Sequence, residues 1–151
     1  MLSLRKGKKG FTLIELMVVV AIIGVLALLG LRLYTGQQMK AKNAVVKANT
    51  GTIQTLIQAE LADTTSALVW GMVDDDTATG LFAKSGIHVP DGGPQTANGT
   101  AAGVVGTVYV VGWDDVTDAK AIAATDISYF KINGNGFDDK DVFTTPLTAR
   151  K

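Results

Sequence analysis

The feature that most constrains this chain is an apolar run of 21 residues, 11–31, which follows a basic segment. Only four residues in the run are not clearly apolar: Thr12, Glu15, Gly24 and Gly30. At about 1.5 Å of rise per residue, a helix of this length would cross the hydrocarbon core of a bilayer, which is about 30 Å thick. The run therefore predicts a membrane-spanning helix.

The basic segment predicts the orientation of that helix. It contains Arg5, Lys6, Lys8 and Lys9, and basic residues beside a span keep that flank in the cytoplasm. A conventional secretory signal would have a shorter apolar region followed by a cleavage site of small residues, and no such site follows Leu31. We expect an N-in, single-pass chain whose remainder lies outside the cytoplasm.

Glu15 is an acid near the cytoplasmic end of the predicted span. A charge at the centre of a membrane helix costs about 2.5–3.5 kcal/mol on insertion scales, unless it reaches the interface. The glutamate therefore either snorkels to the interface or has a specific role within the apolar layer.

Residues 10–16, Gly-Phe-Thr-Leu-Ile-Glu-Leu after a basic leader, resemble the class III signal of type IV pilins and pseudopilins. The resemblance covers about residues 1–60. It implies that residues 1–10 form a leader, which a prepilin peptidase removes by cutting between Gly10 and Phe11. It also implies N-methylation of Phe11 and, during assembly, pairing of its amine with Glu15.

For function, the resemblance implies a structural subunit of a type IV pilus and not an enzyme. Identical subunits would leave the cytoplasmic membrane through an assembly ATPase and platform machinery, and would form a helical filament at the cell surface. Two alternatives stay open: a major pseudopilin of a type II secretion system, and a minor pilin that acts as a binding module. A plain membrane anchor would explain the hydropathy but not Gly10, Phe11 and Glu15.

The chain departs from the family pattern in two places. The family usually has a proline near the twenty-second mature position, where this chain has Arg32; we expect Gly24 and Gly30 to loosen the helix instead, because glycine is a weak helix former. Many pilins close a C-terminal loop with a disulfide, whereas this chain has no cysteine. Another device must hold its C-terminal region.

Apolar residues continue at helical spacing as far as Leu61, and no proline precedes Pro90. We predict one helix over residues 11–62, about 80 Å long. Residues 11–35 form its membrane-spanning and filament-core half. Residues 36–62 form an amphipathic half that lies on a sheet and has a weak point at Gly51. The lysines of this half face either acidic patches of neighbouring subunits or solvent.

Residues 63–151 are predicted to form a globular, β-rich headgroup. Residues rich in β-branched and aromatic side chains indicate strands at 104–113, 127–132 and 142–145. Turn-rich links between them favour a small antiparallel sheet with the long helix on one face, which is an α+β fold. Asn98-Gly99 indicates a turn. Six apolar residues before it are expected to pack on the helix or sheet: Leu68, Val69, Trp70, Met72, Leu81 and Phe82.

The charge distribution excludes several functions. Residues 63–141 contain twelve aspartates and only four lysines, so this part should repel nucleic acid. The single histidine, His88, is expected in a surface loop. The sequence shows no nucleophile elbow, phosphate-binding loop, dinucleotide motif or zinc pattern.

The segment 133–141 is the one candidate for a metal site. An EF-hand register with Gly136 at position 6 places Lys131 and Val142 at ligand positions 1 and 12, which excludes an EF-hand. The resemblance to pseudopilins keeps another type of calcium site open, beside a plain turn with solvated aspartates. Its ligands would come from Asn133, Asn135, Asp138, Asp139 and Asp141. No other cofactor is predicted.

Overall fold

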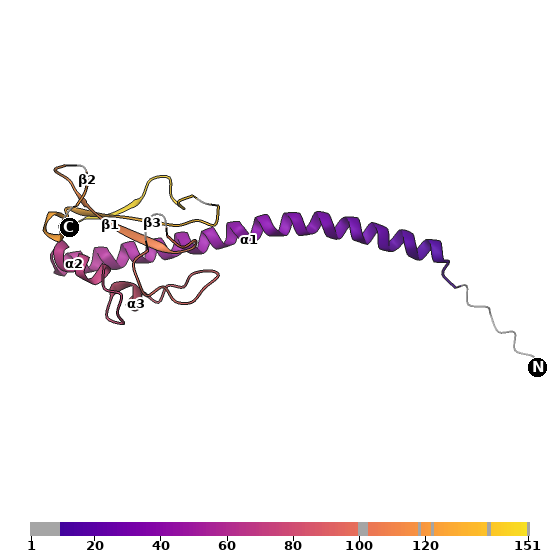
Figure 1. Cartoon of the computed structure of the whole chain (residues 1–151), viewed down its shortest axis with the longest axis horizontal. Coiled ribbons are helices and arrows are strands. Elements are labelled where there is room, and N and C mark those ends of the chain that lie inside the picture. The colour runs from indigo at the N-terminus through magenta and orange to yellow at the C-terminus, as the bar shows by residue number, and fades with distance from the viewer. Residues whose placement is uncertain (1–9, 100–102, 118, 122, 139, 151) are drawn as a thin grey trace, which may run out of the picture. The chain divides into compact units, whose positions relative to one another are not determined.

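The computed structural model describes residues 10–150, except 100–102, 118, 122 and 139. The helices are α1 (Leu13–Asp63), α2 (Ser66–Val73), α3 (Leu81–Ser85) and the 3-10 helix η1 (Ala124–Asp126). The strands are β1 (Val108–Asp114), β2 (Ala119–Lys120), β3 (Tyr129–Gly134) and β4 (Leu147–Arg150) (Figure 1). A long N-terminal helix with a small antiparallel sheet confirms the predicted α+β fold.

Helix α1 is continuous from Leu13 to Asp63 and contains 51 residues. It begins two residues later than predicted and ends one residue later. Gly24, Gly30 and Gly51 lie inside it without a break, so the expected loosening is not seen in this single chain. Unwinding in a filament stays a prediction. Contacts divide the chain into two units, residues 1–38 and 39–151.

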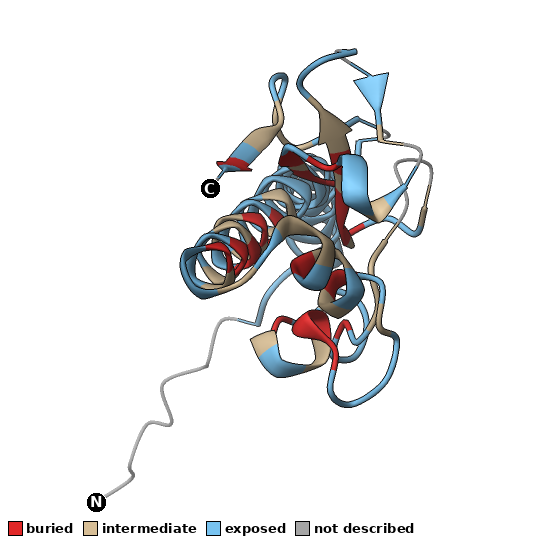
Figure 2. Cartoon of the chain, turned by 90° about the vertical axis from the view of Figure 1, so that its left-hand side faces the viewer, coloured by how far each residue is buried: buried red, intermediate tan, exposed pale blue. Residues whose placement is uncertain are grey.

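One stripe of α1 belongs to the core of the second unit. Its members recur every three or four residues, as one face of a helix requires: Val46, Thr50, Ile53, Ile57 and Leu61. The sheet contributes alternate residues of β1, β3 and β4 to the same core: Val108, Val110, Phe130, Ile132 and Ala149. Figure 2 shows these buried residues where α1 meets the strands. Trp70 of α2 stacks on Phe130 with the ring centroids 6.3 Å apart.

The sheet has the order β2-β1-β3-β4, and every pair of neighbouring strands is antiparallel. Strand β1 starts at Val108 instead of residue 104, and β3 spans 129–134 instead of 127–132. The predicted strand at 142–145 is wrong, because those residues form a loop and β4 begins at Leu147. The loop is held by the Asn133 side chain, which accepts a hydrogen bond from Phe143 N and donates one to Phe143 O.

Residues 63–103 contain two short helices that periodicity did not reveal. Five of the six apolar residues named above pack as expected: Val69, Leu81 and Phe82 are buried, and Trp70 and Met72 lie against the core. The prediction was wrong for Leu68, which is 60% exposed. A helix of eight residues such as α2 buries one side only, here Val69 and Val73, so the members of an apolar run that lie on its other side face solvent.

Side-chain amides cover the edge of β1 that β2 leaves open. The predicted turn at Asn98 is wrong. The Asn98 side chain instead exchanges two hydrogen bonds with the backbone of Val110, at 2.9 and 3.0 Å. Gln95 makes the same two-way contact with Val108, and Gly99 forms a parallel bridge with Tyr109. These amides satisfy backbone groups that an open sheet edge would expose.

Helix α1 covers the opposite edge of the sheet with two glutamines that lie one helical turn apart. Gln54 donates to Thr148 O at 2.9 Å, and Gln58 both donates to Arg150 O and accepts from Arg150 N. In this cysteine-free chain, these contacts and the Asn133–Phe143 pair hold the C-terminal region. These hydrogen bonds take the place of the disulfide that closes the C-terminal loop in many pilins.

Gly134 marks the closest approach of β3 to α1, and we expect Gly134→Ala to destabilise the fold by about 1–3 kcal/mol through overpacking. An added Cβ would lie 2.4 Å from Val46 Cγ1, and valine in a helix has little rotamer freedom with which to move away. The measurement is denaturant unfolding of the full chain in detergent.

Gly51→Ala is the matched control within the same helix. Nothing lies within 4 Å of a Cβ at Gly51, so alanine should stabilise the protein by about 0.5–1 kcal/mol. Equal stability of the Gly134→Ala variant and the parent would show that the helix and sheet are not in close contact there.

Candidate functional site

The predicted cleavage point lies in an exposed, non-helical segment. Gly10 and Phe11 precede the first helical residue, Leu13, and among the described residues no atom beyond the chain neighbours lies within 4 Å of a Cβ placed on Gly10. Phe11 is 91% exposed. Proteases cut exposed segments that lack regular structure, so this geometry leaves the Gly10–Phe11 bond accessible. Cleavage and methylation at this bond stay predictions.

Thr12 and Glu15 cap the N-terminus of α1 reciprocally. Glu15 N donates to Thr12 Oγ1 at 3.3 Å, while Glu15 Oε2 accepts from Thr12 N and from Thr12 Oγ1, each at 2.8 Å. A threonine before the helix with a glutamate three residues later is a capping box. Thr12 was missed as a site residue, although the spacing Thr-x-x-Glu was a signal that could have revealed it.

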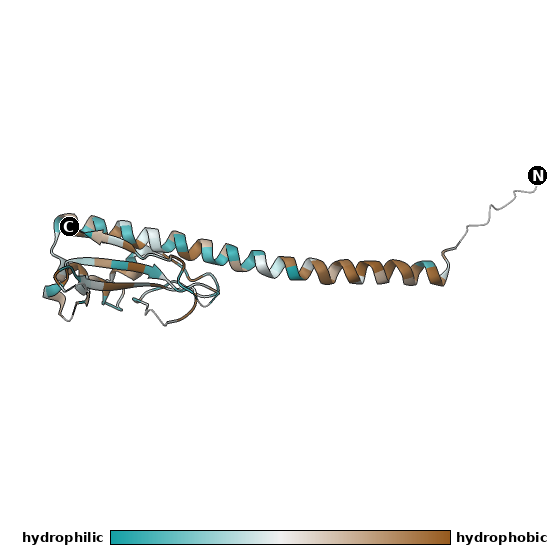
Figure 3. Ribbon diagram, turned by 90° about the horizontal axis from the view of Figure 1, so that it is seen from above, coloured by the Kyte–Doolittle hydropathy of each residue, from teal (hydrophilic) through white to brown (hydrophobic). Residues whose placement is uncertain are grey.

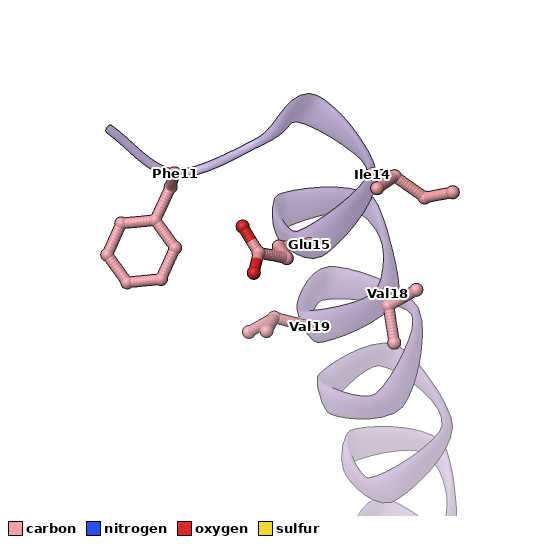
Figure 4. Close-up of a pocket in the computed structure, with 5 residues that line it drawn as sticks. All are labelled: Phe11, Ile14, Glu15, Val18 and Val19. Atoms are coloured by element: carbon pink, nitrogen blue, oxygen red, sulfur yellow. The ribbon is translucent and has the colours of Figure 1, made fainter. Parts of the chain in front are cut away.

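The capping box places the Glu15 carboxylate at the start of the helix, beside Phe11. Figure 4 shows both side chains at a recess of α1 that Ile14, Val18 and Val19 also line. The N-terminus of a helix carries a partial positive charge that favours a carboxylate. Cleavage after Gly10 would create an amine one residue before the Thr12 N–H that Glu15 already contacts. The arrangement can therefore bring an ammonium and a carboxylate together in an apolar setting.

None of the described apolar side chains of the first unit is buried. Large apolar side chains along it are half exposed or more, from Phe11 at 91% to Leu33 at 74%. Helix α1 is long and apolar enough to cross a membrane, and no residue of its most apolar stretch is buried. Figure 3 shows this apolar stretch in brown. Apolar surface of this extent marks a contact with lipid or with other protein chains.

The structure gives the described candidate calcium ligands protein partners. Asn133 bonds to Phe143, Asn135 donates to Thr107 Oγ1 at 3.0 Å, Asp138 accepts from Asn43 at 3.2 Å, and Asp141 accepts from the Tyr109 hydroxyl at 2.9 Å. Asp139 lies outside the described residues. Across the described part of the chain, no three His, Cys, Asp or Glu residues are grouped so as to hold a metal. Calcium binding stays a prediction.

Asn43 of α1 contacts the loop that carries the candidate calcium ligands, although the sequence did not indicate it as a functional residue. It accepts a hydrogen bond from Phe137 N at 2.8 Å and donates one to Asp138. Its helical context gave no signal of this contact across 94 residues. His88 is exposed, as predicted, with Nδ1 3.0 Å from Gly86 O.

We expect Thr12→Val to fray the first turn of α1 by about 1 kcal/mol, because the hydroxyl that caps the helix is lost. The measurement is hydrogen exchange of the amides of residues 13–16 in detergent micelles. Thr12→Ser retains the hydroxyl and serves as the control. Unchanged protection in Thr12→Val would show that the capping box does not stabilise the helix start.

Tyr109 should make stability sensitive to alkaline pH. Burial, reinforced by the hydrogen bond to Asp141, raises the pKa of Tyr109 to about 12. Because the folded-state pKa lies above the ordinary value of about 10, this stabilisation is complete below about pH 10 and is lost as pH rises through the folded-state pKa. We expect the free energy of unfolding to fall less steeply above about pH 10 in Tyr109→Phe than in the parent, by denaturant titration. Identical pH profiles would contradict this assignment.

Comparisons with known proteins identify relatives of this chain. Residues 5–31 match the family model described as the prokaryotic N-terminal methylation motif. Two type IV major fimbrial proteins FimA of Dichelobacter nodosus are 36% and 38% identical to this chain over 95 residues, which is 63% of this chain. These matches span about half of the relatives' own length, 54% and 56%. No solved structure gives a significant match.

A fimbrial protein of Moraxella nonliquefaciens matches over a longer region. It is 32% identical over 123 residues, which is 78% of this chain and 77% of the relative. Type IV pilins are structural proteins and not enzymes, so the expectation of a non-enzymatic protein is confirmed. On the strength of the N-terminal motif, the long exposed helix and this extended similarity, the chain belongs to the type IV pilin family.

Proposed function

We propose that this chain is a major pilin, the subunit that polymerises into a type IV pilus. The observation that carries the proposal is the methylation motif at residues 5–31, whose apolar part lies in α1 and is covered by no other part of the described chain. Such a helix needs lipid around it before assembly and other helices around it afterwards. The names of the Dichelobacter relatives, type IV major fimbrial proteins, favour a pilus over a pseudopilus.

The precursor waits in the cytoplasmic membrane with its basic leader inside, and prepilin peptidase cuts after Gly10. The accessibility of the Gly10–Phe11 segment supports this step. The new amine of Phe11 is then methylated. After cleavage, the apolar helix begins with an ammonium group that has the Glu15 carboxylate within its first turn.

Assembly transfers the apolar half of α1 from lipid into a bundle of identical helices. Lipid tails are as apolar as leucine, so the hydrophobic effect does not drive this transfer. An assembly ATPase and platform protein supply the work. In the bundle, Glu15 pairs with a Phe11 amine, and this pair fixes the axial register because a shifted subunit would leave a buried charge uncompensated.

Three Glu15 variants separate charge pairing from helix capping. Glu15→Val and Glu15→Gln should both accumulate as stable membrane protein and give few filaments, since neither supplies a negative charge. Glutamine retains an oxygen that can accept from Thr12 N, so a defect in Glu15→Gln isolates the charge. Glu15→Asp is the control that keeps it. The measurement is filament sheared from cells, by immunoblot and electron microscopy; normal piliation of Glu15→Gln would refute charge pairing.

The leader assignment has an independent test. Gly10→Glu should leave the precursor uncut, because the small residue before the cut is lost, while Gly36→Glu leaves processing intact. Mass spectrometry of the parent should give methylated Phe11 as the first residue. A different mature N-terminus would refute the assignment.

The pseudopilin alternative has a test of its own. A calcium-dependent rise in the melting temperature of the protein would favour a pseudopilin over a pilin.

A further inference from the structure

The charges of the second unit are segregated along α1. Its first three turns carry Lys40, Lys42 and Lys47, with no acid between residues 39 and 59. Its last turn carries Glu60 and Asp63, and no basic residue occurs between positions 48 and 83. One end of this helical segment is therefore basic and the other is acidic.

The three aspartates at 74–76 belong to the acidic end. They lie between Met72 and Thr79, which line one recess together with Leu56 and Glu60 of α1. Asp75 is used within its own loop, where it accepts from Thr77 N and Thr79 Oγ1, each at 2.8 Å. The remaining acids define an acidic surface: Glu60, which is half-buried, with Asp63, Asp74 and Asp76, which are exposed. Lys84 also lines the recess, so the end is acidic but not uniformly so.

At the basic end, Lys40 and Lys47 are exposed, and neither forms an ion pair within the described residues. Lys42 is already paired with Asp91. Lys40 and Lys47 are seven residues apart, which places them on one side of the helix two turns apart. We call them the lysine pair. Lys47 Nζ lies 5.7 Å from the centre of the Phe143 ring, so the pair is on the flank of α1 that faces the C-terminal loop.

The lysine pair and the two acids that α1 contributes to the acidic surface, Glu60 and Asp63, lie on different flanks of the same helix. At 100° per residue, Lys47 and Glu60 are about 140° apart around the axis, and the midpoint of the lysine pair is about 27 Å along it from the midpoint of Glu60 and Asp63. This separation exceeds the screening length of about 8 Å at physiological salt. The two groups therefore cannot neutralise each other within one subunit.

We propose that the lysine pair of one subunit contacts the acidic surface of a second copy in the filament. The inference rests on the proposed pilin function, which requires parallel copies of α1. Complementary groups on different flanks, offset along the axis, make a heterologous contact, and such a contact continues into an open helical assembly without closing into a dimer. The geometry assigns the contact to neighbours offset by about 20–35 Å along the axis, once side-chain reach is included.

Charge reversal tests the contact. Lys40→Glu should reduce sheared filament about tenfold, because it replaces an attraction by a repulsion in every copy. Lys120→Glu makes the same change of net charge at another exposed lysine and should leave the yield within about twofold. Adding Asp63→Lys to Lys40→Glu should recover most of the yield. Normal filaments from Lys40→Glu, or no recovery in the double variant, would overturn the proposal.

Cross-linking tests the geometry directly, because the chain has no cysteine of its own. Filaments of the double variant Lys40→Cys, Asp63→Cys treated with a short bis-maleimide should give a ladder of multimers. Each single variant should stop at the dimer, and the pair Lys120→Cys, Asp63→Cys should give no ladder. Absence of the ladder from intact filaments overturns this inference and leaves the pilin function standing. Absence of filaments from the parent chain overturns the pilin function itself.

Discussion

The burial of one stripe of α1 against the sheet is the interaction on which the structure of the second unit depends. Val46, Ile53 and Ile57 are fully buried there, and each such side chain contributes about 1.5–3 kcal/mol relative to exposure. The strands are short, and among the described residues the sheet has no other long element on its core face. Because the same continuous helix also carries the apolar span, the element that organises the headgroup core is the one that would pack in the proposed filament.

Polar side chains of α1 add hydrogen bonds to the apolar contact between the helix and the sheet. Gln54 and Gln58 bond to the backbone of β4, and Asn43 bonds to the loop before it. A hydrogen bond contributes only about 0.5–1.5 kcal/mol net, but a buried or edge backbone group left without a partner costs more. The amides of Gln95 and Asn98 do the same at the edge of β1. Side-chain amides thus hold the two edges of the sheet in a chain that has no disulfide.

Glu15 has one partner before the proposed cleavage, Thr12, and would gain a second partner after it, the Phe11 amine. In the uncleaved chain one oxygen of its carboxylate, Oε2, accepts two hydrogen bonds from Thr12, which makes an acid tolerable at the start of an apolar helix. The proposed amine at Phe11 would add a charged partner at the same place. The Thr-x-x-Glu spacing of the capping box is present in the sequence. It did not lead to a predicted cap, because the processing signal by itself accounts for Glu15.

The sequence by itself determined the long helix, the apolar span, the motif around Gly10 and Glu15, and the α+β class. These features depend on periodicity and on short motifs, which neighbouring residues encode. Only the tertiary structure decided that 142–145 is a loop, that β4 lies at 147–150, and that Asn98 lies at a strand edge. The reason is that side-chain hydrogen bonds between residues 10 to 95 positions apart, such as Asn133 to Phe143 and Asn43 to Asp138, select among local conformations of similar energy. No local pattern records such partners.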